Sequence, residues 1–137
     1  MTQEQKDLLI KDLCCRMPYG VKADLKKTNC YDDTNKVSEQ DIYSFRTGRP
    51  LVEDYGQHDY YKVIVTDIKP YLFPIESMTE EQKVIYGDLC YKVLYNSKGL
   101  INLDVMEYVN WCYKNHIDIN NLIPMGLAND ATNKNIY

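Results

Sequence analysis

The chain has 137 residues, of which 45% are apolar and 26% charged, and its formal net charge is −4. This composition is typical of a single globular domain and excludes an intrinsically disordered chain. The acidic balance disfavours nucleic acid as a partner, because a phosphate backbone would be repelled unless a local basic patch were present. The basic cluster Lys22, Lys26 and Lys27 is interrupted by Asp24 and is typical of a solvated strand face.

The sequence favours a cytoplasmic protein without a membrane segment. The N-terminal MTQEQKDLL lacks the basic start and apolar stretch of a signal peptide, and the apolar runs are too short to span a bilayer. The five cysteines are odd in number and do not resemble a disulfide framework. We therefore expect free thiols in a reducing compartment.

The N-terminal segment predicts a helix over Thr2–Met17. Thr2 and Gln5 have the spacing of a capping box, and apolar side chains then recur every four residues. A proline and a glycine directly after the segment end the helix.

The middle of the chain predicts strands. Residues 21–25 alternate between apolar and charged side chains, as in a half-buried strand, and residues 42–46 and 51–52 are weaker candidates. The strongest strand prediction is 60–68, whose central Val-Ile-Val run indicates burial on both faces. The prolines within 69–74 predict an extended crossing that leads into the next helix.

A second helix is predicted from Glu80 to Tyr95. Two overlapping capping-box patterns, Ser77 with Glu80 and Thr79 with Gln82, mark its start. Asn96 to Gly99 has the composition of a helix stop.

This second helix has two apolar sides. One contains Leu89, and the other is a stripe formed by Val84, Tyr91 and Tyr95. Such a helix is either enclosed within the domain or presents one side to a partner, and the sequence leaves both possibilities open. Gly87 costs roughly 1 kcal/mol relative to alanine at a helix interior, which indicates close backbone packing there.

A third helix is predicted to begin at Asn102 or Asp104. Its broad apolar face is expected to be buried and includes Val105, Val109, Cys112 and His116. Together, these elements predict an α+β fold in which a small antiparallel sheet of three to five strands is covered by three helices. Residues 1–128 are expected to form one globular domain, and the polar tail 129–137 is expected to fray.

Three stretches resemble a large group of short uncharacterised proteins from gut-bacterial genomes, prophages and other mobile elements. They are KDLCCRMPYGVK (Lys11–Lys22), IKPYLFPIESMTEEQ (Ile68–Gln82) and NHIDINNLIPMGLA (Asn115–Ala128). This chain departs from that pattern at Phe73, where an arginine is usual, and at Asn120–Asn121, where arginine-glycine is usual. The resemblance implies a mobile-element setting and no mechanism.

The sequence contains no specific enzyme signature, and no cofactor or metal site is predicted. The chain has only two histidines, and no two cysteines have the two-residue spacer of a zinc knuckle, so no zinc motif is present in the sequence. Cys112 and His116 have helical contact spacing, so a cysteine-dependent enzyme that uses Cys112 or Cys15 with a histidine is one alternative. His58, in an acidic loop, is a weak candidate acid or base.

The leading hypothesis is a non-enzymatic interaction or regulatory protein of a mobile element or prophage. Its 13 tyrosines favour contact surfaces, because tyrosine combines an apolar ring with a polar tip. The partner is expected to be a protein, either a second copy or a host or phage protein, and a nucleic-acid-associated accessory factor is a third hypothesis. The candidate protein-contact residues are Trp111, Tyr108, Tyr91, Tyr95, Tyr71 and Phe73.

Overall fold

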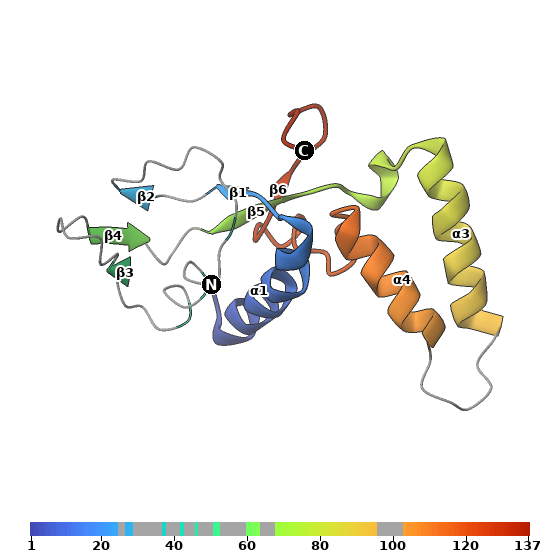
Figure 1. Ribbon diagram of the computed structural model, residues 1–137, viewed down its shortest axis with the longest axis horizontal. Helices are drawn as coiled ribbons and strands as arrows, with labels where there is room; N and C mark the ends of the chain where they lie inside the picture. Colours follow the sequence, from blue (N-terminus) through green and yellow to red (C-terminus); the bar gives the residue numbers. More distant parts are fainter. Residues whose placement is uncertain are drawn as a thin grey trace.

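The computed structural model describes residues 1–24, 27–28, 37, 42, 46, 51–52, 60–63, 68–95 and 103–137, with backbone only at 27–28, 51–52 and 60–63. These residues include three α-helices, α1 (Gln3–Arg16), α3 (Glu80–Tyr95) and α4 (Leu103–Lys114). They also include two small sheets of three strands each (Figure 1). The predicted α+β class with a small sheet is confirmed.

The central sheet has the strand order β1 (Ala23–Asp24), β5 (Lys69–Leu72), β6 (Asn129–Asp130). β1 is antiparallel to β5, whereas β6 is parallel to it. The sheet is therefore mixed, and the prediction of a purely antiparallel sheet is corrected. α3 and α4 lie between β5 and β6 in the chain, and parallel neighbours require such a long crossover connection.

The proline segment contributes the central strand of this sheet, although its prolines predict an extended crossing. Pro70 is buried and lies opposite Ala23 in the β1–β5 register. The adjacent Tyr71 N–H donates to the Lys22 carbonyl at 2.9 Å, so pairing continues past the residue that lacks a donor. A proline normally disfavours a central strand, and tertiary pairing has overridden that preference here.

The second sheet consists of β2 (Lys27–Thr28), β4 (Tyr60–Val63) and β3 (Leu51–Val52), all antiparallel. It lies on the opposite side of the central sheet from α3 and α4 (Figure 1). The strand predictions at 51–52 and at the start of 60–68 are confirmed, while residues 64–67 lie outside the described residues. Ile42 and Arg46 are helical, so the strand predicted over 42–46 is wrong at its two described positions.

α1 packs on the central sheet and forms the main core with it. The Thr2–Gln5 capping box is present, and the helix buries Leu9 and Leu13 completely. The core residues are Leu9, Leu13, Val21, Ala23, Val37, Ile42, Ile68, Leu72, Leu122, Leu127 and Ala128. α3, in contrast, packs mainly against α4 and lies at the far end of the molecule from α1 (Figure 1).

α3 begins where the sequence predicts, through one of the two capping boxes. The Thr79 hydroxyl accepts from the Gln82 N–H at 3.2 Å, and the Gln82 side chain accepts from the Thr79 N–H at 3.0 Å. The Ser77 hydroxyl instead donates to the Pro74 carbonyl at 2.8 Å within the short 3₁₀ helix η2 (Ile75–Ser77). The helix start therefore depends on local hydrogen bonds that the sequence predicts.

α4 is buried only toward its C-terminal end. Cys112 is fully buried and His116 is 6% exposed, but Val105 is 37% exposed and Val109 is half-buried. The prediction that this whole face is core is wrong for Val105. The first turns of α4 extend beyond the sheet together with α3, so the sheet cannot cover them (Figure 1).

Residues 129–137 pack against the sheet and the end of α4, although their polar composition predicts a frayed tail. The Ala131 N–H donates to the Leu72 carbonyl at 2.8 Å. The Tyr137 ring stacks on His116 with centroids 3.9 Å apart, and its hydroxyl donates to the Tyr71 carbonyl at 2.8 Å. Tyr137 thus anchors the segment through contacts that its polar composition does not predict.

Candidate protein-contact site

α3 and α4 form a hairpin whose inner side is aromatic. The Tyr86 and Tyr108 hydroxyl oxygens are 3.2 Å apart and their rings 5.6 Å apart, while Trp111 lies 6.3 Å from Tyr86. Leu89 of α3 is buried on the same side. Hydrophobic and aromatic contacts with α4 therefore hold α3 in position.

The opposite side of α3 is apolar and exposed. Residues at positions i, i+3, i+7, i+10 and i+11 of the helix share this side, and we call them the outer face of α3. The exposed fraction is 66% for Val84, 64% for Tyr91, 69% for Leu94 and 69% for Tyr95. The outer face consists of Val84, Gly87, Tyr91, Leu94 and Tyr95.

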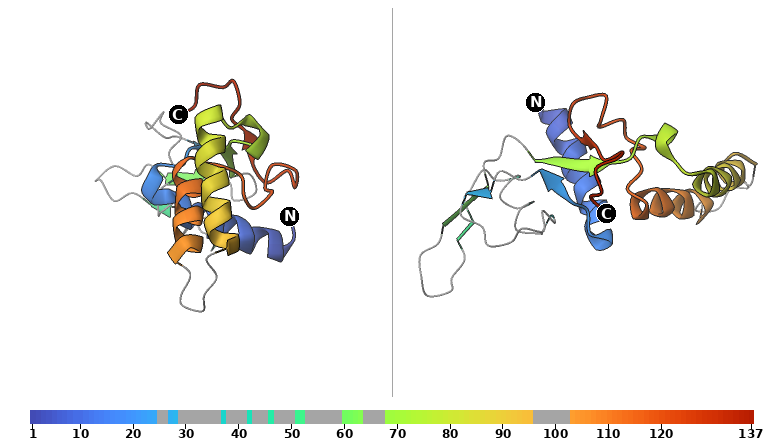
Figure 2. Two further views of the ribbon diagram at one scale, coloured as in Figure 1. Left: turned by 90° about the vertical axis from the view of Figure 1, so that its right-hand side faces the viewer. Right: turned by 90° about the horizontal axis from the view of Figure 1, so that it is seen from above.

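The tyrosines of the outer face form a pair. The ring centroids of Tyr91 and Tyr95 are 4.5 Å apart with an interplanar angle of 33°. In the left view of Figure 2, α3 lies in front and no other described element crosses it. The sequence left open whether this stripe is enclosed or presented outward, and in the described structure it is presented outward.

Gly87 lies in the middle of the outer face and leaves it flat. A Cβ built on Gly87 meets no side chain or distant backbone atom within 4 Å. Close packing within the described chain therefore does not explain the glycine, which costs roughly 1 kcal/mol at a helix interior.

A shallow apolar groove runs beside the outer face. Its volume is about 260 Å³, and it lies between the two helices of the hairpin. The residues that line it are Cys90, Val93, Leu94 and Tyr108. Because Leu94 belongs to both features, the groove and the outer face are continuous.

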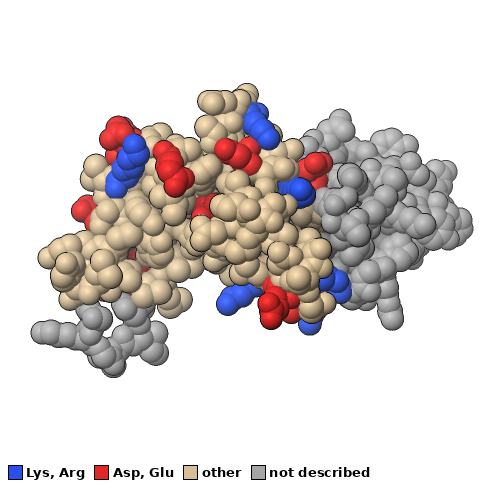
Figure 3. Space-filling view, turned by 180° about the vertical axis from the view of Figure 1, so that it is seen from behind, with Lys and Arg blue, Asp and Glu red and all other residues tan. Residues whose placement is uncertain are grey.

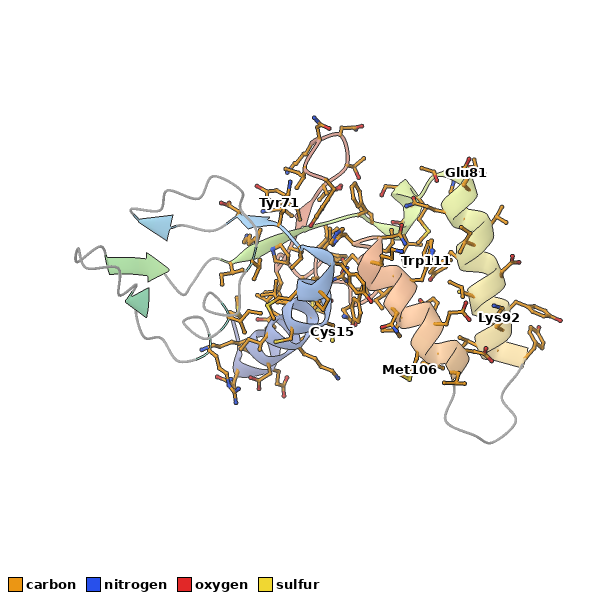
Figure 4. The ribbon with its side chains drawn as sticks, viewed as in Figure 1. Cys15, Tyr71, Glu81, Lys92, Met106 and Trp111 are labelled. Carbon is orange, nitrogen blue, oxygen red and sulfur yellow. The ribbon has the colours of Figure 1, made fainter. Side chains whose placement is uncertain are left out.

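The predicted contact residues do not gather on one surface. Tyr91 and Tyr95 lie on the outer face of α3, but Tyr108 and Trp111 are half-buried within the hairpin. Tyr71 and Phe73 lie on and next to β5, where they contact the C-terminal segment: Lys134 lies over the Tyr71 ring, and Phe73 packs near Tyr137. Figure 4 shows Tyr71 and Trp111 in separate parts of the molecule.

The thiol–imidazole pair that the sequence suggests is buried and unsuited to nucleophilic catalysis. Burial raises the pKa of the Cys112 thiol to about 11, so a reactive thiolate is disfavoured. Burial, reinforced by the Arg16 charge, lowers the pKa of His116 from 6.5 to about 4. Both groups are therefore neutral near pH 7, and Cys112 has no exposed surface from which to attack a substrate.

Among the other described cysteines, the exposure of Cys14 differs from what the helical pattern of α1 predicts. Cys14, which the helical pattern places with the apolar face of α1, is exposed, and Cys15 is half-buried. The four described cysteines are free thiols. Cys30 and His58 lie outside the described residues, so their predicted roles stay predictions.

A buried ion pair on the inner face of α1 was not predicted from the sequence. Asp12 accepts from Arg16 Nε at 2.7 Å, and both side chains are completely buried. Arg16 Nη2 donates to the Ile117 carbonyl at 2.8 Å, and Asn120 donates to Asp12 at 2.8 Å. A signal was present in the sequence, because Asp12 and Arg16 share the face of Leu9 and should be buried with it.

The described surface offers no other obvious chemistry. Figure 3 shows positive and negative side chains interspersed over the face in view, without a continuous basic stripe among its described residues. No group of three or more metal-ligating side chains occurs in the part of the chain that the structure describes. Of the described helices, none has the length and apolar content needed for a membrane crossing.

Comparisons with protein-family models, with curated proteins and with solved structures found no match to this chain. The surface chemistry of the described residues is therefore the basis on which a function can be inferred.

Proposed function

We propose that this protein works by non-enzymatic contact with another protein through the outer face of α3. The observation that carries the proposal is the exposure of Val84, Tyr91, Leu94 and Tyr95 along one helix face. Scattered exposed apolar residues are ordinary, whereas a contiguous apolar patch of several hundred Å² is typical of an interaction site. Tyrosine is among the residues most enriched where binding energy concentrates in protein interfaces.

The setting proposed for this contact is a prophage or other mobile element, in the cytoplasm. Support for the setting comes from the three stretches that resemble mobile-element proteins. Free thiols at the described cysteines agree with a reducing compartment. A regulatory or adaptor role in such an element requires a binding surface and no catalytic centre.

The cysteine-dependent enzyme and the nucleic-acid factor have less support. The completely buried Cys112, with its raised pKa, argues against the Cys112 form of the enzyme hypothesis. The interspersed charges in Figure 3 argue against a phosphate-binding stripe on that face.

The proposal is tested by removing the two tyrosines. Tyr91→Ser/Tyr95→Ser should leave the free energy of unfolding within about 1 kcal/mol of wild type, because both rings are mostly exposed. Association should weaken more than tenfold, which is a cost of roughly 1.4 kcal/mol or more. Sedimentation velocity measures self-association, and quantitative capture from a host extract measures binding to other proteins.

A matched control removes exposed apolar side chains elsewhere. Tyr19→Ser/Met125→Ser changes residues that are 37% and 46% exposed and lie outside the outer face. This control should associate like wild type. If the Tyr91/Tyr95 variant also associates like wild type, with itself and with captured proteins, the proposed function is wrong.

A further inference from the structure

The Tyr137 hydroxyl takes the place of a ladder hydrogen bond in the central sheet. Lys22 lies opposite Tyr71, one step beyond the β1–β5 register that pairs Ala23 with Pro70. Alternate opposite pairs in an antiparallel ladder exchange two hydrogen bonds. One of the two is direct here, because the Tyr71 N–H donates to the Lys22 carbonyl at 2.9 Å. In place of the other, the Lys22 N–H donates to the Tyr137 hydroxyl at 3.1 Å, and that hydroxyl donates to the Tyr71 carbonyl at 2.8 Å.

The inserted hydroxyl gives the same backbone groups two alternative arrangements. With Tyr137 in place, the Lys22 N–H and the Tyr71 carbonyl are both satisfied through its oxygen. With Tyr137 withdrawn, the two groups face each other across the ladder and can bond directly, as their register requires. Withdrawal therefore leaves neither group without a partner, which avoids the usual cost of an unpaired backbone group.

Lys22 and Tyr137 hold a segment whose middle is exposed. We call residues 131–137 the strap. Lys22 Nζ donates to the Ile136 carbonyl and lies 5.9 Å from the centroid of the Tyr137 ring, which stacks on His116. Residues 133–135 are exposed and bury little surface. The attachment of the strap is thus concentrated at its two ends, Ala131 and Tyr137.

The strap is costly to keep ordered. Asn133 and Asn135 have left-handed backbone at φ 62° and 46°, where a side chain other than glycine meets a steric cost. Ordering each residue of the strap also costs conformational entropy. The Ala131 N–H, which donates to the Leu72 carbonyl at 2.8 Å, and the contacts of Tyr137 offset these costs. Such a balance favours opening of the strap without unfolding of the sheet beneath it.

We propose that Tyr137 is a latch, and that the strap exchanges between a latched and a released state while α1 and the central sheet stay folded. This inference does not depend on the outer face of α3. In the released state the Lys22 N–H bonds directly to the Tyr71 carbonyl, and the faces of Phe73 and His116 that Tyr137 covers become accessible. A partner that binds these faces draws on the released population, so the latch sets its apparent affinity.

The first test detects the exchange of hydrogen bonds at Lys22. NMR scalar coupling across a hydrogen bond connects an amide nitrogen to a carbonyl carbon only where the two groups bond directly. In wild type the Tyr71 nitrogen should couple to the Lys22 carbonyl carbon, without the reverse coupling from Lys22 to Tyr71. In Tyr137→Ala both couplings should be present. Tyr95→Ala removes a ring that is 69% exposed on α3 and should give the wild-type pattern.

The second test needs no variant. In native-state hydrogen exchange, the Ala131 amide should exchange through an opening populated at about 1%, which is within the usual range of minor states. The amide of Leu13, completely buried in α1, should exchange only on global unfolding and be protected at least about 100-fold more strongly.

Two results would overturn the latch. One is a Tyr137→Ala variant that keeps the coupling from Tyr71 to Lys22 but does not gain the reverse coupling. The other is equal protection of Ala131 and Leu13, which would mean that the strap opens only when the whole domain unfolds. The second result decides the question even if Tyr137→Ala fails to fold.

Discussion

The buried Asp12–Arg16 pair provides a sharp test of how α1 is held in the fold. Asp12→Ala would leave the Arg16 guanidinium without its counter-ion in a place where its side chain has no exposure. Among the described residues, its remaining partners would be the Ile117 carbonyl and the Tyr113 ring, 4.8 Å from the guanidinium carbon. Neither contact carries a negative charge, so the arginine charge would be uncompensated.

The expected loss of stability is about 3–5 kcal/mol, the usual cost of removing one partner of a buried ion pair. The loss of stability should lie in this range because Asp12→Ala removes three hydrogen bonds at once, two from Arg16 and one from Asn120. A small domain has only about 5–15 kcal/mol of total stability. Asp12→Ala should therefore lower the urea midpoint sharply.

The control removes both charges together. Asp12→Leu/Arg16→Met keeps apolar volume under α1 and should cost only about 1–2 kcal/mol, less than the single variant. Urea unfolding followed by circular dichroism and by Trp111 fluorescence measures both, since Trp111 is the one tryptophan of the chain. A single variant as stable as the double variant would refute this account of the pair.

The remaining predictions concern His116, Tyr137 and the thiols. Because burial lowers the pKa of His116 to about 4, the unfolded chain takes up a proton near pH 6.5 that the folded chain does not. Stability should therefore fall by up to roughly 3 kcal/mol between pH 6.5 and pH 4 in urea unfolding. His116→Asn, which tolerates the left-handed backbone at φ 56°, should remove this slope, and an unchanged slope would assign it to other groups. Tyr137→Phe should cost about 1 kcal/mol by losing the hydroxyl hydrogen bonds, and Tyr137→Ala about 3 kcal/mol by also losing the stack on His116. Equal stability of Tyr137→Ala and wild type would mean that the C-terminal segment is not anchored. A thiol reagent followed by peptide mass spectrometry should label the exposed Cys14 rapidly and the buried Cys112 slowly. The opposite order would contradict the burial of Cys112.

Several local features of this protein follow from neighbouring residues alone. The capping boxes at Thr2 and Thr79 form as the sequence predicts, because each needs only groups three residues apart. The predicted and observed start of α3 at Glu80 agree for the same reason. The α+β class follows from the helical and alternating periodicities, which are also local.

The sequence could not show which apolar side of α3 is covered. Both sides have helical spacing and apolar residues, and their difference comes from α4, which covers the side with Leu89 and leaves the side with Tyr91 exposed. The contact candidates Tyr108 and Trp111 are half-buried for the same reason. Helical periodicity detects a face but contains no information on its neighbour.

Long-range pairing decided the rest. Pro70 lies in a central strand because β1 and β6 approach β5 from distant parts of the chain. Asp12 and Arg16 are buried because the segment after α4 closes over them and supplies the Ile117 carbonyl and the Asn120 amide. The sequence by itself determined the starts of α1 and α3 and the fold class, through interactions between near neighbours. The sheet order, the buried ion pair and the exposed outer face of α3 depend on contacts between residues far apart in the chain, which only the tertiary structure specifies.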